Sequence, residues 1–230
     1  MVDMESQPVI SVRGEAALEV QPEIAVLGVT VMAQDKDRRR ALELLAGRAR
    51  AVAGLIKGYG DAVEKLESGP ATVHPVFKEG KGRERVTGYV ARAGLSVTVG
   101  DFTVLGELVP KLASQEMVEV TGPAWRLRLG SQVYRQARLA AARDATQRAR
   151  EYGEAFGGTV TGLVEAADRG LLGADWDATK RAPASLRRPA ASAGGMEEPE
   201  LPEFDFEPAW QTVGAQVEAR FTMTAPRFGE

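Results

Sequence analysis

SQVYRQARLAAARDATQRAREYGEAF, residues 131–156, is an alanine- and arginine-rich run, and Gly157-Gly158 and the segment TVTGLVE at 159–165 follow it directly. The run predicts a long helix, the glycine pair predicts its end, and residues 159–165 read as a strand. No catalytic group stands in a known spacing within the run. This stretch therefore indicates a fold and not a reaction.

Composition sets broad limits on the class of protein. The chain has 230 residues, of which 44% are hydrophobic and 27% are charged, as in ordinary globular proteins. A chain of this length buries about 70% of its unfolded surface, so it needs no covalent cross-links. The net charge of −3 argues against nucleic acid as a main partner. The absence of cysteine excludes disulfides, thiolate metal sites and cysteine nucleophiles.

The first residues, MVDMESQP, are polar and acidic and lack the basic start and apolar run of a signal peptide. No apolar run approaches the roughly 20 residues of a membrane span. We therefore expect a cytoplasmic protein without a membrane span.

Two strands are predicted at the start of the chain. Residues 9–20 alternate between apolar and polar side chains, which is typical of a half-buried strand. Residues 24–32 are mostly apolar on both faces and predict a central strand. Because only a short turn at 21–23 separates them, we expect these two strands to form an antiparallel hairpin. The apolar face of the first strand comprises Ile10, Val12, Ala16, Leu18 and Val20.

A helix is predicted next, from an N-cap at Asp35 or Asp37 to about Gly58. Strands are predicted at 71–77, 86–99 and 117–129. Asp101 is expected to cap a shorter helix, which Pro110 should kink or end because proline lacks an N–H and clashes with the preceding turn. The apolar stripe of the first helix comprises Leu42, Leu45, Ala49, Val52 and Ile56.

The apolar periodicity that predicts helices and strands is missing at about 169–207. This segment is rich in alanine, proline, glycine and serine, and an acidic run begins at Glu197. This composition predicts a disordered loop. Residues 209–225 alternate cleanly and predict a final core strand that returns to the sheet. The order β-β-α-β-β-α-β-α-β-loop-β predicts an α+β fold of antiparallel sheets with helices packed on one face. We expect one domain over 1–230, or two lobes.

Short motifs occur along the chain in a specific order and spacing: Gly14-Glu15-Ala16, Pro22-Glu23, Ala33 with Asp35 and Asp37, Pro75, Val86–Arg92, Leu95–Val99, Asp101-Phe102, Leu105-Gly106, Ala141–Ala145, Arg148-Ala149 and Phe156–Glu165. Together these motifs resemble the SIMPL-domain family, and the resemblance covers nearly the whole chain except the loop near 169–207. It implies an α+β fold, ring- or channel-like homo-oligomers in some members, and no established catalytic residue. Members include periplasmic immunogenic proteins, a stress-linked enterobacterial protein and an animal adaptor that associates with a signalling kinase.

His74 is the only histidine and could be imagined in a triad with Ser68 or Ser96. No Gly-x-Ser-x-Gly elbow frames a serine, and His74 directly precedes Pro75 in a predicted strand, so a structural or surface role is favoured. One histidine without cysteine also leaves only carboxylates for a metal. We therefore predict no catalytic, cofactor-binding or metal-binding residue.

Three charged features have both a functional and a structural interpretation. Gly80 and Gly82 could cradle a phosphate, but a solvated hairpin turn is favoured because no Gly-Lys-Ser/Thr ending follows. The arginines of the long helix could bind an anionic partner, although nearby acids predict a neutralised, solvated face. The acidic run after Gly195 reads as a spacer or as a docking segment. The residues concerned are Lys78, Lys81, Arg83 and Arg85 in the turn, and Arg135, Arg138, Arg143, Arg148, Arg150, Asp144, Glu151 and Glu154 in the helix.

Two functions follow, with a distant third. The first is a non-enzymatic, self-assembling SIMPL-type protein, a homo-oligomer larger than a dimer that acts as a scaffold or stress-related assembly. The second is a monomeric or dimeric adaptor that presents the 169–207 loop to a protein partner. The third is a hydrolase with an unrecognised carboxylate site.

Overall fold

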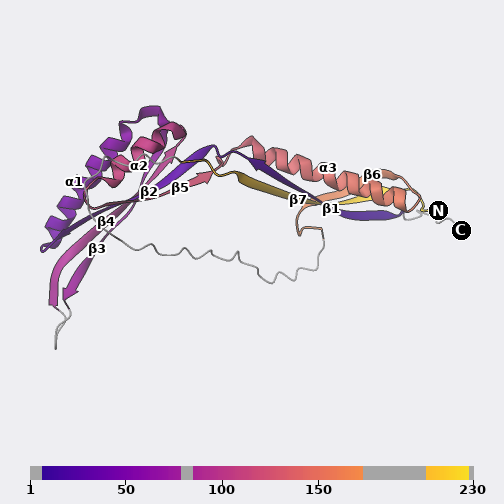
Figure 1. Cartoon of the computed structure of the whole chain (residues 1–230). Helices are drawn as coiled ribbons and strands as arrows, with labels where there is room; N and C mark the ends of the chain where they lie inside the picture. The colour runs from indigo at the N-terminus through magenta and orange to yellow at the C-terminus, as the bar shows by residue number, and fades with distance from the viewer. Residues whose placement is uncertain (1–6, 79–84, 173–205, 228–230) are drawn as a thin grey trace. The chain divides into compact units, whose positions relative to one another are not determined.

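The computed structural model describes residues 7–78, 85–172 and 206–227 (Figure 1). The chain divides into two compact units. The terminal unit comprises Met1–Val20, Leu129–Gly195 and Thr212–Glu230, and the central unit comprises Gln21–Arg128 and Met196–Gln211. The order of helices and strands, the α+β class and the antiparallel sheets are as the sequence predicts.

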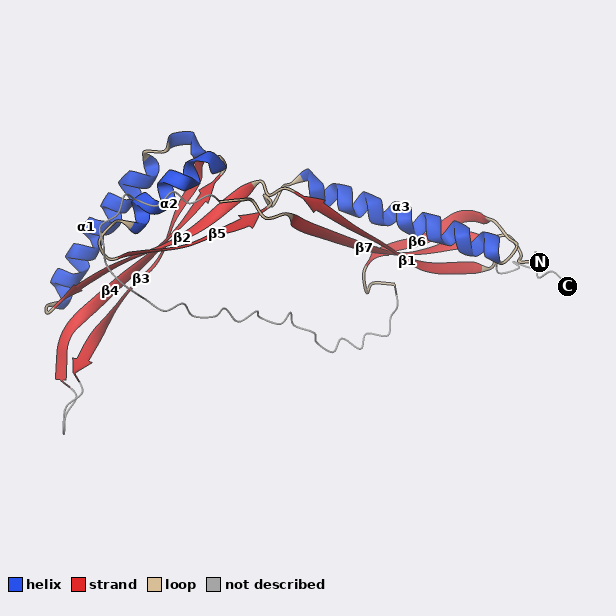
Figure 2. Ribbon diagram, viewed as in Figure 1, coloured by secondary structure: helices blue, strands red, loops and turns tan. Residues whose placement is uncertain are grey.

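The central unit is a four-stranded sheet with two helices on one face (Figure 2). The strand order is β3-β4-β2-β5, so β2 is an interior strand, as its apolar faces predict. Short 3-10 turns precede β3 and α2. The elements are β2 (Ile24–Asp35), α1 (Arg38–Lys57), β3 (Val63–Lys78), β4 (Arg85–Val99), α2 (Leu105–Ala113) and β5 (Val118–Arg126).

Helix α1 begins where the sequence predicts, because the Asp37 side chain accepts a hydrogen bond from the Arg40 N–H at 2.9 Å. Its buried stripe contains Ala41, Leu45, Val52 and Ile56. Leu42, which the sequence assigns to that stripe, is 39% exposed. Since Ala41 holds the buried position, its neighbour Leu42 lies about 100° away around the helix.

Helix α2 continues through Pro110 to Ala113, so the proline does not end the helix at its own position. Pro110 is buried together with Leu105, Leu108 and Leu112, and it serves as part of the core.

The predicted hairpin between the first two strands is wrong. Strand β2 pairs with β4 on one edge and β5 on the other, so neither edge is open to β1 (Val9–Val20). β1 belongs to the other sheet, next to β7. A short connection favours a hairpin only when an edge is free to pair, and here distant strands occupy both edges.

The terminal unit has a three-stranded sheet of order β1-β7-β6, built from β1, β6 (Val160–Asp168) and β7 (Gln211–Met223). The final strand β7 is central, which confirms its predicted return to a sheet. Nearly all of the predicted loop at 169–207 lies outside the described residues, because 173–205 are not described.

Helix α3 (Gln132–Ala155) covers β1 at very short range. A stripe of small residues on α3 is buried against the sheet. Opposite it, a Cβ placed on Gly14 of β1 would lie 2.0 Å from the Ala141 carbonyl oxygen and 2.4 Å from the Ala145 nitrogen. Only glycine allows the two backbones to approach this closely. The stripe comprises Ala137, Ala141, Ala145, Ala149 and Gly153.

Candidate functional site

The structure does not bring the imagined triad together. His74 is exposed on β3 and lies opposite Val90 on β4. Ser68 is six residues away along β3, and Ser96 is six residues from Val90 along β4. At about 3.3 Å per residue these serines are roughly 20 Å from His74, far beyond hydrogen-bond range.

Two of the described carboxylates, Asp101 and Glu218, have shifted pKa values, and both shifts are downward. Hydrogen bonds from the Thr103 side chain and backbone lower the pKa of Asp101, and a hydrogen bond from Arg13 lowers the pKa of Glu218. A carboxyl group that donates a proton near neutral pH needs a raised pKa. Within the part of the chain that is described, no three acidic or histidine side chains are grouped to hold a metal ion.

The glycine-rich turn that could cradle a phosphate lies outside the described residues, since 79–84 are not described. Lys78 and Arg85, which flank it, form the last backbone pair of β3 and β4.

The arginines of α3 are only partly neutralised. Arg148 pairs with Asp144 at 2.8 Å. Glu151 accepts a hydrogen bond from Gln147 and not from an arginine. Over residues 7–78, 85–172 and 206–227, four arginines of this helix form no ion pair: Arg135, Arg138, Arg143 and Arg150.

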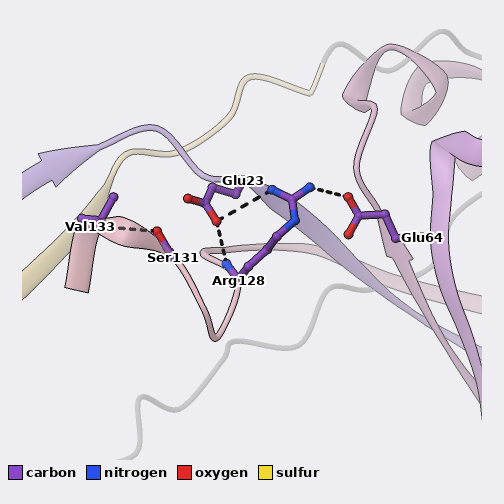
Figure 3. Close-up of polar contacts among 5 residues, drawn as sticks. All are labelled: Glu23, Glu64, Arg128, Ser131 and Val133. Atoms are coloured by element: carbon purple, nitrogen blue, oxygen red, sulfur yellow. Dashed lines mark hydrogen bonds and ion pairs between the residues drawn. The ribbon is translucent and has the colours of Figure 1, made fainter. Parts of the chain in front are cut away.

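A polar cluster in the central unit has Arg128 at its centre (Figure 3). The guanidinium hydrogen-bonds Glu64 at the start of β3, which raises the pKa of Arg128. The backbone N–H of Arg128 donates to Glu23 at 3.0 Å. The guanidinium also pairs with the Glu23 carboxylate at 3.7 Å. The Arg128 side chain is 46% exposed, so its ion pairs with Glu64 and Glu23 contribute about 1 kcal/mol or less. The cluster fastens the chain after β5 to the starts of β2 and β3.

The end of the β3–β4 hairpin exposes apolar side chains. Pairing of β2 with β4 stops at Asp35 and Tyr89, so beyond this point β3 and β4 form a two-stranded ribbon (Figure 1). On this ribbon Phe77 lies directly opposite Val86, and they are 48% and 41% exposed. We call this pair the hairpin patch. Two-stranded ribbons are marginal in water, and cover over their apolar residues stabilises them.

A second apolar pair lies at the end of α3 in the terminal unit. Tyr152 and Phe156 are four residues apart, which places them on one side of the helix end, and they are 52% and 46% exposed. We call this pair the helix-end patch. Neither patch is evident from the sequence, since the exposure of a side chain depends on which distant parts of the folded chain cover it.

The outer strands of the central sheet are poorly suited to pairing with another chain. β3 contains Pro70 and Pro75, and its register shifts at three places. β5 contains Pro123, and its pairing with β2 is irregular. Prolines and bulges of this kind block edge-to-edge pairing. In the central unit, side-chain patches are therefore the better candidates for contact between copies.

The helices that the structure describes include none with the length and apolarity to span a membrane.

The chain belongs to the SIMPL family, described as protein of unknown function (DUF541), whose sequence model matches residues 10–221. This match confirms the resemblance found in the sequence. A comparison with curated proteins gives no match.

Proposed function

We propose that this protein is a non-enzymatic, self-assembling member of the SIMPL family that forms homo-oligomers larger than a dimer and acts as a scaffold or stress-related assembly. The observation that carries the proposal is the hairpin patch, where Phe77 and Val86 lie opposite each other on a part of the ribbon that pairs with no third strand among the described residues. Burial of a fully exposed side chain of this kind contributes about 1.5–3 kcal/mol, and since these two are 48% and 41% exposed, burying the remainder of each contributes roughly half of that.

A size above the dimer follows from the presence of two patches. A single patch that meets its own copy closes a dimer by two-fold symmetry. The hairpin patch and the helix-end patch lie in different units of the chain. A contact between unlike patches leaves one of each unoccupied on every pair, so further copies add until a ring closes.

The test compares the solution masses of two double variants by light scattering. Phe77→Ser/Val86→Ser and Tyr152→Ser/Phe156→Ser are each expected to lower the mass of the assembly. Because the four side chains are substantially exposed in the single chain, both double variants should still fold, with circular dichroism spectra like that of wild type, and their melting temperatures should fall only by the stabilisation that assembly provides. Leu129→Ser is the matched control, since Leu129 is fully exposed and belongs to neither patch. Wild-type mass in both double variants would contradict the proposal.

The alternative function, an adaptor that presents residues 169–207, gives a different result when residues 175–205 are deleted. Self-assembly through the two patches predicts the same number of chains per assembly after deletion. Loss of assembly on deletion would place the contact between copies in that segment and contradict assembly through the two patches. The adaptor instead predicts that the undeleted chain is a monomer or dimer and that deletion removes its binding to a protein partner.

A further inference from the structure

Among the described residues, α3 is the one helix of the terminal unit, and it covers only part of the three-stranded sheet. α3 packs chiefly on β1, where Gly14 meets Ala141 and Ala145, and it contacts β6 only slightly. A helix with its side chains is about 10–12 Å wide, and strands are about 4.8 Å apart, so one helix covers about two strands. In the sheet β1-β7-β6 the third strand, β6, is then left without a described helix above it, whereas Ala219 and Phe221 of β7 are buried with the alanines of α3. In the central unit two helices cover four strands, and most core side chains there are fully buried.

An apolar groove lies beside α3, on the β6 side of the sheet. A hollow of about 100 Å³ lies between α3 and the strands β6 and β7, and Leu163 on its β6 side is 60% exposed. It adjoins an open surface of α3, with Ala142 and Thr146 common to both. The hollow is lined by Ala142, Ala145, Thr146, Leu163, Ala166, Val217, Ala219 and Phe221.

The helix side of this groove is cationic. Arg143 and Arg150 lie on this open surface of α3, and neither forms an ion pair within the described residues. The one carboxylate on that surface, Asp144, already pairs with Arg148. The positive charge is local, since the chain as a whole carries −3.

This positive charge favours a negatively charged binding partner in the groove. The α3 helix of a second copy would bring the same arginines against Arg143 and Arg150, and like charges at close range oppose binding. An acidic segment would instead form charge-assisted hydrogen bonds with two guanidinium groups that have no ion-pair partner among the described residues. The apolar floor is the kind of groove in which an amphipathic helix lays its apolar face.

We propose that the groove formed by α3, β6 and β7 binds an acidic, amphipathic helical segment of another protein. Apolar residues of that segment pack on Leu163, Ala166 and Val217. Its carboxylates face Arg143 and Arg150.

The test uses a fluorescent synthetic helix with leucine on one face and glutamate on the other, and the same helix with lysine in place of glutamate. Fluorescence anisotropy with the full chain should show binding of the glutamate helix, weakened by added salt, and no binding of the lysine helix. Arg143→Glu/Arg150→Glu should weaken binding of the glutamate helix by about tenfold or more. Arg38→Glu/Arg50→Glu on α1 makes the same change in net charge in the central unit and should leave the affinity unchanged.

A second pair of variants tests the floor of the groove. Leu163→Asp should abolish binding, and Val164→Asp is the control because Val164 is 55% exposed and does not line the hollow. Both side chains are exposed, so both variants should fold. The proposal is overturned if the two helices bind equally, if the glutamate helix does not bind, or if either groove variant binds as well as its control.

Discussion

Replacing Gly14 by alanine adds only one methyl group, yet we expect it to destabilise the terminal unit severely. The added Cβ would lie 2.0 Å from the carbonyl oxygen of Ala141 and 2.7 Å from the Cβ of Ala145. An ordinary contact needs at least 3.4 Å. Two of the three nearest atoms belong to the backbone of α3, so no side-chain rotation can relieve the clash.

The cost can be estimated from the displacement of α3. Restoring ordinary contact requires the helix to move away from β1 by more than about 1 Å, and a gap of that size forfeits a quarter to a half of the dispersion energy of the separated atoms. Overpacking costs about 1–3 kcal/mol in general, and the rigid neighbours place this site near about 3 kcal/mol. At about 2–4 °C per kcal/mol, the melting temperature should fall by about 6–12 °C.

Differential scanning calorimetry of the full chain measures this fall directly. Gly47→Ala is the matched control, because Gly47 lies inside α1 and a Cβ there meets nothing within 4 Å. That control should raise stability slightly, by about 0.5–1 kcal/mol, as removal of a helical glycine usually does. A melting temperature for Gly14→Ala within a degree or two of wild type would refute the close packing of α3 on β1.

Two further predictions concern the terminal unit. The Ser131 side chain accepts a hydrogen bond from the Val133 N–H at 3.2 Å (Figure 3). Ser131→Ala should therefore lower the free energy of unfolding by about 1 kcal/mol, whereas Ser131→Asp retains an acceptor and should lower it less. Equal losses in the two variants, measured by thermal unfolding, would argue against capping. The hydrogen bond from Arg13, at 2.9 Å, holds the pKa of Glu218 below its ordinary 4.5. The ionised Glu218 therefore stabilises the folded state above pH 4.5, and this contribution is lost as the pH falls through the lower pKa of the folded state. Arg13→Gln should therefore flatten the acid-induced fall in melting temperature, with Arg50→Gln as control, and an unchanged acid profile would contradict this.

The sequence predicts best those features that depend on neighbouring residues. Ser131 and Gly157 bound α3, and Asp37 begins α1, because caps act over three or four residues. Alternation predicts β7 as a core strand for the same reason, since the period of two is local.

Pairing between distant strands is what the sequence could not decide. The predicted hairpin of β1 and β2 is wrong because β4 and β5 occupy both edges of β2. No residue pattern near the turn at residue 21 indicates this pairing with distant strands. The predicted burial of Leu42 is wrong for a similar reason. Ala41 and Leu42 both fit an apolar stripe on the helix, and only packing against the sheet determines which of the two is buried.

The candidate surfaces also depend on distant parts of the chain. Phe77 and Val86 are visible in the sequence only as strand residues, and their exposure follows from the end of β2 at Asp35. One local signal was available for α3, because small residues recur every fourth position from Ala137 to Gly153. That spacing indicates a helix that another backbone approaches closely.

The mass of the wild-type protein in solution, measured by light scattering at micromolar concentration, tests the central claim most directly. Self-assembly through the hairpin and helix-end patches predicts a mass more than twice that of the 24.6 kDa chain. That mass should correspond to a whole number of chains and should not change on modest dilution, because a closed ring leaves no patch to exchange. A mass of 24.6 kDa under these conditions would contradict the claim and favour the adaptor.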